Sequence, residues 1–272
     1  MSWTEQVTNP TGDAMNPDDV MSLIKDVSAR IIEPRFRALG RSDVHSKGLG
    51  DLVTIADREA EAEFIARLGQ AFPDAVVIGE ESCYADPSLL GAIGVAEHCF
   101  VVDPVDGTGN FVRGKDDFAV MVAEMRGPRT VAGWIWQPRH GRAYQASVGG
   151  GVTCNGEPIA PTPTHPRPTG AAGQRAWRDF DAAGRISPVR ESAHCAGIDY
   201  PHVMTGRFDF IAYRHPKPWD HLAGGLMLAE LGGGIVHPDG SLWAPGDEDA
   251  PIISSRDLDT ARRVGALWPA RP

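Results

Sequence analysis

Cysteine is scarce in this sequence, with four residues in a chain of 272. No two cysteines form a C-x-x-C pair, and none has the spacing to histidine that a zinc finger requires. A zinc module of that kind is therefore excluded. We interpret the four cysteines as reduced thiols that pack as small apolar side chains, and we therefore expect a cytoplasmic protein.

Long apolar runs and an excess of positive charge are also absent. No stretch approaches the ~20 apolar residues of a membrane span, and the polar, acidic N-terminus does not resemble a signal peptide. The formal net charge is −10. Nucleic acid and anionic membranes need a basic footprint, so we expect neither as a partner. A small phosphorylated molecule is compatible with this charge, because bound cations supply positive charge locally.

The chain alternates helical and extended patterns, which predicts an α/β or α+β protein. Asn16 and Pro17 are the residue types of a helix N-cap and first turn, and Pro34 should end or kink that helix. We also expect a glycine-rich loop at 45–50, helices over 57–71 (capped by Asp57) and 220–234, and strands over 75–82 and 98–105.

The pattern changes after residue 111. Three apolar-rich runs separated by Gly, Pro and charge predict an antiparallel meander. The segment 160–170 then has four prolines in eleven residues, which indicates an exposed connection. We therefore expect an N-terminal α+β subdomain over 17–160 and a C-terminal α/β subdomain over 161–266. The residues after 265 are expected to form a loose tail.

Carboxylates end two predicted strands and begin a predicted helix. Glu80 lies at the end of the first strand, Asp103 and Asp106 end the second, and Asp220 starts the helix. Ligands of α/β proteins bind at strand ends. Each close pair of carboxylates repels by on the order of 4 kcal/mol at an effective dielectric near 20. Such a cluster takes up protons or binds cations, and its hard oxygens select Mg²⁺, Ca²⁺ or Mn²⁺.

The turn after the second strand combines acids with glycines. Its Asp-Pro-x-Asp sequence would put both carboxylates, and the carbonyl of Val105, on one side. Asp103 could then bridge two ions roughly 4 Å apart, as in two-metal phosphoryl hydrolysis. Gly107 and its neighbours can turn backbone amides toward an anion, and Thr108 adds a hydroxyl that can orient water. Taken alone, each segment is more typical of an ordinary turn or helix cap.

Four blocks occurring together resemble the inositol monophosphatase family of Mg²⁺-dependent, lithium-sensitive phosphomonoesterases. They are DLVTIADREAE (51–61), GEES (79–82), DPVDGTGNF (103–111) and PWDHLAGGLMLAELGG (218–233). The resemblance implies a layered α/β/α/β/α sandwich in a homodimer. It also implies direct attack of water on phosphorus, without a covalent intermediate, on a small phosphorylated metabolite.

The resemblance implies a role for each matching residue. Glu80, Asp103 and the Val105 carbonyl would bind a first Mg²⁺, while Asp103, Asp106 and Asp220 would bind a second. Mn²⁺ is an alternative ion, and Li⁺ would inhibit by taking a Mg²⁺ position. Glu80 would also bind a third, weaker ion, with Asp57 as a nearby carboxylate, and Glu80 and Thr108 would activate the attacking water. The backbone amides of Gly107 and Thr108 would bind the phosphate. Lys47 would lie on a mobile loop that closes over the site.

The sequence departs from the family pattern in the predicted substrate wall. Tyr213 stands where inositol-specific relatives carry a Glu that binds sugar hydroxyls. The neighbouring Arg214, His215 and Lys217 are either an exposed polar loop or a basic rim suited to a second anionic group. Asp106 and His194 are expected to complete the substrate wall.

Two classes of function are compatible with this sequence. The first is a phosphatase for an inositol or sugar phosphate, with histidinol phosphate or 3′-phosphoadenosine 5′-phosphate as alternatives. The Asn that follows Gly109, in place of the Lys or Arg often found in relatives acting on 3′-phosphoadenosine 5′-phosphate, favours the inositol and sugar branch. The second is a non-catalytic regulator that keeps the fold and binds a protein partner. Retention of every metal-binding carboxylate favours the phosphatase.

Overall fold

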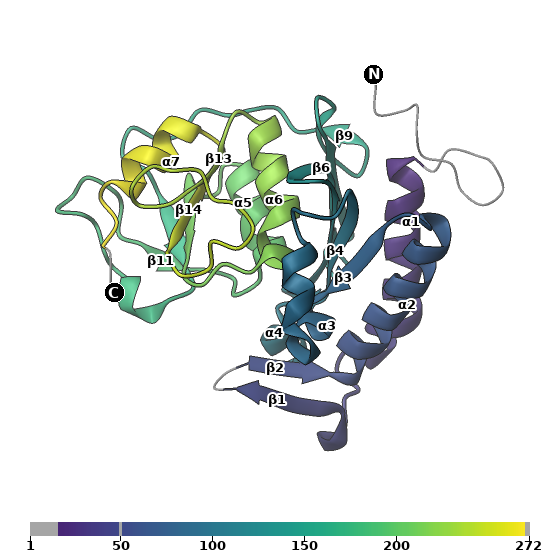
Figure 1. Ribbon diagram of the computed structural model, residues 1–272. Helices are drawn as coiled ribbons and strands as arrows, with labels where there is room; N and C mark the ends of the chain where they lie inside the picture. The colour runs from purple at the N-terminus through teal and green to yellow at the C-terminus, as the bar shows by residue number, and fades with distance from the viewer. Residues whose placement is uncertain (1–15, 49–50, 270–272) are drawn as a thin grey trace.

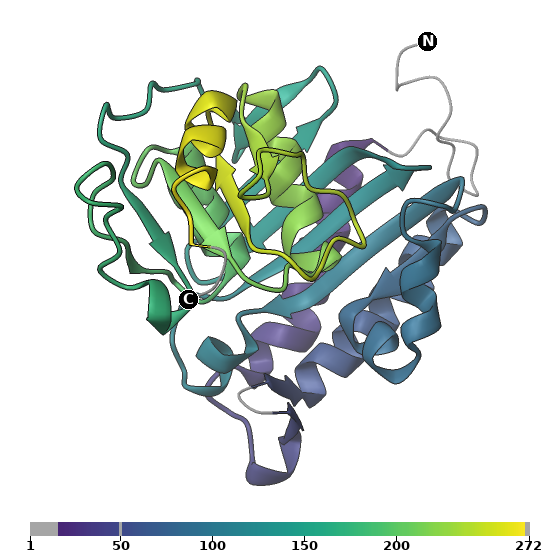
Figure 2. The same ribbon diagram turned by 60° about the vertical axis from the view of Figure 1, so that its left-hand side comes forward.

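The computed structural model describes residues 16–48 and 51–269 and has five layers (Figure 1). Helices α1 (Pro17–Val27) and α2 (Ile55–Ala71) cover one face of a seven-stranded sheet. Helices α5 (Ala196–Met204) and α6 (Pro218–Glu230) lie between this sheet and a five-stranded sheet, whose far face is covered by α7 (Leu258–Gly265). The turned view shows α1 behind the long strands and α6 in front of them (Figure 2). The predicted α/β/α/β/α sandwich is confirmed.

The large sheet has the strand order β3-β4-β5-β6-β7-β8-β9. Only β3 and β4 are parallel, and every later pair is antiparallel, so the predicted meander is confirmed. The strands are β3 (Val76–Gly79), β4 (His98–Asp106), β5 (Ala119–Arg126), β6 (Arg129–Gln137), β7 (Arg142–Ser147), β8 (Gly151–Cys154) and β9 (Glu157–Pro158).

The small sheet has the order β11-β10-β12-β14-β13, and β1 pairs with β2 in a separate hairpin. Strand β10 is parallel to β11 and β12, while β14 is antiparallel to both of its neighbours. The bounds are β1 (Val44–Gly48), β2 (Asp51–Thr54), β10 (Gly170–Ala172), β11 (Arg190–Glu191), β12 (Phe210–Tyr213), β13 (Gly234–Val236) and β14 (Ile252–Ser255), with short helices α3 (Glu80–Ala85), η5 (Pro87–Ala92) and α4 (Thr108–Val112).

Three hydrophobic clusters pack the layers against one another. One joins α1 and α2 to the large sheet, and a second, around Trp177 and Trp268, joins α7 to the small sheet. The third packs α5 and α6 between the two sheets and includes Ile135 of the first predicted subdomain and Leu222 of the second. The predicted division at 160–161 therefore crosses a shared core, and the two subdomains stay a prediction.

Helix starts largely follow the sequence signals. The Asn16 side chain accepts hydrogen bonds from the amides of Asp18 and Asp19, and Pro17 is the first residue of α1. The α-helix ends at Val27, earlier than the predicted end near Glu33, and the chain continues as a π turn and then a 3₁₀ turn that contains Pro34 and ends at Arg35.

Helix α2 begins two residues before the predicted start. Thr54 is its N-cap, and Asp57 is the third helical residue, where its carboxylate accepts the Thr54 amide at 2.8 Å. The predicted cap at Asp57 is therefore wrong. Helix α6 likewise begins at Pro218, so Asp220 lies in its first turn.

Two further sequence predictions were wrong. The expected strand over 75–82 ends at Gly79, because the Glu61 carboxylate accepts the amides of Glu81 and Ser82 at 2.8 Å each and caps α3. A Cβ on Gly79 would lie 2.1 Å from the Glu61 side chain, so glycine is required there. The expected loop at 45–50 is mostly strand β1, with residues 49–50 outside the described part of the chain.

The proline-rich segment is exposed at 160–163 and 165–167, as predicted. Arg256 donates hydrogen bonds to the carbonyls of Thr162 and Pro163, which fixes the segment to the small sheet. The tail is not loose up to Trp268, which is buried against Trp177. Within the described residues, none of the helices has the length and apolar character needed to cross a bilayer.

Candidate active site

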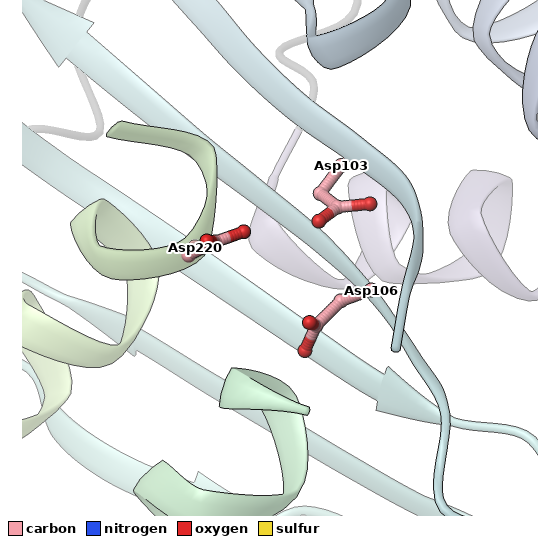
Figure 3. Close-up of side chains that lie close together, drawn as sticks. All are labelled: Asp103, Asp106 and Asp220. Atoms are coloured by element: carbon pink, nitrogen blue, oxygen red, sulfur yellow. The ribbon is translucent and has the colours of Figure 1, made fainter. Parts of the chain in front are cut away.

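Three carboxylates converge between β4 and α6. The side chains of Asp103, Asp106 and Asp220 have oxygen atoms that all lie within 4.8 Å of one another. Figure 3 shows Asp220 reaching from α6 toward the two aspartates at the end of β4. Asp103 and Asp106 are only 2% and 7% exposed. The two halves of the chain therefore build one acidic cluster, as the sequence predicted, in which Asp103 and Asp106 are buried and Asp220 is partly exposed.

A β-bulge aims both β4 carboxylates at the same point. Asp103 pairs with Met121 and Asp106 with Ala119, so three steps along β4 oppose two steps along β5. Pro104 has no amide to donate to the ladder, which favours an irregularity at this position. The extra residue offsets the strict alternation of side chains that would otherwise put Asp103 and Asp106 on opposite faces.

Neutral donors hold the aspartates in place. The Val105 amide donates to Asp103 Oδ1 at 3.0 Å. The Gly197 amide and the Cys195 thiol donate to Asp106 Oδ2 at 2.5 and 3.0 Å. One oxygen of Asp106 is therefore already occupied, which leaves Oδ1 as the freer acceptor.

Burial, followed by repulsion from nearby carboxylates, raises the pKa of Asp103 and Asp220 well above the usual range. Burial also raises the pKa of Asp106, against the hydrogen bonds from the 195–197 segment. Buried, mutually repelling oxygens are a donor set that fits hard divalent cations such as Mg²⁺.

Lys47 lies between two further acids. Its Nζ is 2.8 Å from Glu80 Oε1 and 2.5 Å from Glu81 Oε1, and its side chain is only 3% exposed. Burial, partly offset by Lys47, raises the pKa of each of these two glutamates to about 7. Burial opposes the charge of Lys47, but Glu80 and Glu81 outweigh it and raise the lysine pKa. Lys47, which was predicted to lie on a closing loop, thus contacts Glu80 and Glu81 directly.

Thr108 connects the turn after β4 to α2. Its Oγ1 lies 3.1 Å from Asp57 Oδ1 and 3.0 Å from the Val105 carbonyl oxygen, within reach of donation to either. Gly107 has φ 81°, and a Cβ there would lie 3.0 Å from Cys195 Cβ. Glycine is therefore needed for both the backbone conformation and the close approach of the 195–197 segment. Burial raises the pKa of Asp57.

One cavity of about 560 Å³ contains most of the predicted site. The lining residues that were singled out from the sequence are Lys47, Glu80, Asp103, Val105, Asp106, Gly107, Thr108, Lys217 and Asp220. The remaining lining residues, Cys83, Tyr84, Pro87, Leu90 and Trp219, were not singled out from the sequence. Four of them lie in the short segment 83–90, which has no periodic sequence pattern that would indicate a site.

The predicted substrate wall is only partly at this cavity. Lys217 lines it, with its ammonium paired to Glu248. Tyr213 is not among the lining residues, and its hydroxyl donates to Asp199 at 3.1 Å. His194 is exposed and lies 3.2 Å from Glu191. Substrate contacts by Tyr213 and His194 stay predictions.

These raised pKa values predict how the stability of the metal-free protein depends on pH. The usual pKa of a glutamate, 4.5, is raised to about 7 at Glu80 and Glu81, so the folded state binds more protons than the unfolded state between these values. This contribution to stability is present below the lower value and is lost as the pH rises through the upper one. Without divalent ions, we expect Tm to be a few degrees higher at about pH 6 than at about pH 8.

Added Mg²⁺ should raise Tm more at the higher pH, because it binds ionised carboxylates. Glu80→Gln should weaken both effects, whereas Glu157→Gln, a change at an exposed strand residue, should leave them intact. Differential scanning fluorimetry at both pH values measures this. A metal-free Tm that is lower at pH 6 than at pH 8 would contradict the prediction.

Comparison with known proteins gives a consistent result. A family model, "Inositol monophosphatase family", matches residues 18–269. "Phosphatase IMPL1, chloroplastic" of Arabidopsis thaliana is 30% identical over 225 residues, 76% of this chain but only 58% of that protein. Inositol-1-monophosphatase of Rhizobium meliloti is 31% identical over 217 residues, 75% of this chain and 79% of that protein.

The fold comparison agrees. A crystal structure of an IMPase/NADP phosphatase complexed with Mg²⁺ and phosphate matches with a TM-score of 0.76 at 22% identity, over 90% of this chain and 92% of that one. The family model spans nearly the whole described chain, including all four sequence blocks and the acidic cluster that they build. The chain therefore belongs to the inositol monophosphatase family.

Proposed function

We propose that the protein is a Mg²⁺-dependent phosphomonoesterase that hydrolyses a small phosphorylated metabolite, of the inositol phosphate or sugar phosphate type. The observation that carries this proposal is the convergence of Asp103, Asp106 and Asp220 in one cavity with Thr108. Family membership supports the same chemistry. Histidinol phosphate and 3′-phosphoadenosine 5′-phosphate are alternative substrates of the same reaction class.

The three aspartates, Glu80 and the Val105 carbonyl would hold two or three divalent ions, Mg²⁺ or Mn²⁺. When bound, these ions supply electrophilic assistance to the phosphate and increase the acidity of water. The backbone amides of Gly107 and Thr108 would hold phosphate oxygens. Li⁺ would inhibit by competing for one cation position.

Thr108 and Asp57 would move a proton away from the attacking water. The Thr108 hydroxyl can accept a proton from water at Oγ1 while its own hydrogen passes to Asp57 Oδ1, 3.1 Å away. The other oxygen, Oδ2, accepts the Thr54 amide at 2.8 Å, which fixes the carboxylate. Burial raises the pKa of Asp57 and so makes it a better base. Glu80, at the start of α3, would share this role.

The decisive experiment is phosphate release from a panel of phosphate esters, with Mg²⁺ and with a chelator. Release that depends on Mg²⁺ supports the enzyme. No release from any ester under either condition would favour the alternative, a non-catalytic regulator on the same fold.

We further propose a homodimer in a reducing, cytoplasmic compartment. The four described cysteines are free thiols, in agreement with such a compartment.

Lys217 provides a test of substrate charge. Its pairing with Glu248 leaves less of its charge for a second anionic group on the substrate. Glu248→Gln should release the lysine and lower KM for a bisphosphate several-fold more than KM for a monophosphate. Lys217→Ala should instead raise KM for the bisphosphate.

Asp249→Asn is the matched control, because it removes one negative charge from an exposed residue of the same segment. Steady-state kinetics with fructose 1,6-bisphosphate and myo-inositol 1-phosphate measures the effect. Equal changes in KM for both substrates in the Glu248→Gln variant would show that Lys217 does not contact a second anionic group.

A further inference from the structure

The residues that line the cavity are of two chemical kinds. Some belong to the acidic cluster and to the turn at Gly107 and Thr108. Others are apolar or aromatic and are not used by the proposed chemistry, namely Cys83, Tyr84, Pro87, Leu90 and Trp219. These side chains come from α3, η5 and the first turn of α6, so two separate parts of the chain form this apolar wall.

Tyr84 is the most exposed large aromatic side chain of the wall, at 57%. Its hydroxyl donates to the Lys47 carbonyl oxygen at 2.8 Å, and the Lys47 ammonium lies 5.5 Å from its ring centroid. The ring is therefore fixed at the cavity although much of its surface is open. A large exposed aromatic surface that is held in place is typical of a ligand contact.

Leu90 and Trp219 extend the apolar surface into the cavity. Both are partly buried and pack against the largest hydrophobic cluster, so their positions are fixed by the core. Pro87 is exposed and adds a further apolar surface. Trp219 directly precedes Asp220, which places an indole ring next to the acidic cluster in the chain.

Two of the polar groups that line the cavity already have partners. The Tyr84 hydroxyl is bonded to Lys47, and the Lys217 ammonium is paired with Glu248. The hydroxyl groups of a polyol placed here would lose water without gaining equivalent hydrogen bonds, which is unfavourable. A flat apolar ring would instead bury its surface against the wall, which is favourable.

We infer that the leaving group of the preferred substrate carries a flat apolar ring that lies against Tyr84, Leu90 and Trp219. This inference rests on the proposed phosphatase function and replaces its inositol or sugar leaving group with one that carries an apolar ring. The cavity, about 560 Å³, is within the usual range of about 300–1,000 Å³ for small-molecule sites. The reaction is unchanged: the water oxygen bonds to phosphorus, the bond from phosphorus to the alcohol oxygen breaks, and that oxygen takes up a proton.

The test compares kcat/KM for 2-phenylethyl phosphate and glycerol 1-phosphate with Mg²⁺. Both are esters of primary alcohols, and glycerol is the less basic leaving group, so a preference for the phenylethyl ester cannot come from leaving-group chemistry. We expect a preference of about tenfold or more for the phenylethyl ester, mainly through KM. Tyr84→Ala should bring the ratio close to one. Tyr84→Phe should keep it, because the ring remains after the hydrogen bond to Lys47 is lost.

Two further variants complete the design. Leu90→Gln keeps the side-chain size but makes it polar, and should reduce the ratio even if Tyr84→Ala fails to fold. Val95→Ala removes apolar surface from a residue that is 78% exposed and does not line the cavity, and should leave the ratio unchanged.

A wild-type ratio of one or less, or Tyr84→Phe behaving like Tyr84→Ala, would overturn the inference. Equal losses for both esters in Tyr84→Ala would overturn it too, because they would show that the tyrosine acts only through Lys47. Mg²⁺-dependent release of phosphate from glycerol 1-phosphate or myo-inositol 1-phosphate would still support the proposed function in each of these cases. Only the absence of release from these three esters and from every other ester of the panel would remove both.

Discussion

Replacing Asp103 by Asn should lower the Mg²⁺-dependent kcat by about a thousandfold or more, some 4 kcal/mol of transition-state stabilisation. Asp103 would help to hold both of the first two proposed ions, so its loss would affect both positions. Asn has nearly the same shape, and its Oδ1 can still accept the Val105 amide, which lies 3.0 Å from the carboxylate. The loss of activity should therefore come from the loss of charge rather than from a change of fold.

Stability should change in the opposite direction. Burial and the nearby acids Glu80, Asp106 and Asp220 raise the pKa of Asp103 well above its usual range, so an ionised Asp103 destabilises the metal-free fold. Asp103→Asn removes that charge, and we expect a higher Tm without Mg²⁺ and a smaller increase when Mg²⁺ is added.

Asp74→Asn, at an exposed residue, is the matched control and should change neither kcat nor Tm appreciably. Phosphate release and thermal unfolding, each with Mg²⁺ and with chelator, provide the two measurements. An Asp103→Asn variant that keeps near-wild-type Mg²⁺-dependent activity would show that the cations are not held as proposed.

Local patterns predicted much of the fold because they depend on neighbours in the chain. The Asn16-Pro17 start of α1 and the meander after residue 111 follow from caps, turns and apolar spacing. The start of α3 could not be predicted in this way. It depends on the Glu61 carboxylate, 20 residues from the Glu81 amide that it binds, and no rule of local propensity contains that contact.

The acidic cluster was predictable from motif blocks, since Asp103, Asp106 and Asp220 occupy distinctive positions in them. The groups that orient the cluster were harder to predict. Cys195 is 89 residues from the aspartate that its thiol contacts, and only the folded chain shows that contact. The pairing of Lys217 with Glu248 is likewise a tertiary contact, and it leaves less of the lysine charge for an anionic group of a substrate.

Replacing Thr108 by Ala should lower kcat by about 100-fold or more, with a much smaller change in KM. The Thr108 hydroxyl contacts both Asp57 and the Val105 carbonyl oxygen, at 3.1 and 3.0 Å. Alanine removes the atom through which a proton would pass from water to Asp57. The backbone amide of residue 108, proposed to bind phosphate, remains in place, and for this reason KM should change little.

Thr108→Ser is the control that separates chemistry from packing. Serine keeps Oγ1 but lacks the methyl group, so kcat should stay within several-fold of wild type if the hydroxyl is what matters. Loss of one partly buried hydrogen bond costs about 1 kcal/mol, so Tm of the Ala variant should fall by only a few degrees. Pre-steady-state and steady-state phosphate release measure the rate. An unchanged kcat in Thr108→Ala, or an equally large loss in Thr108→Ser, would show that the proton leaves by another route, with Glu80 the remaining acceptor at the cavity.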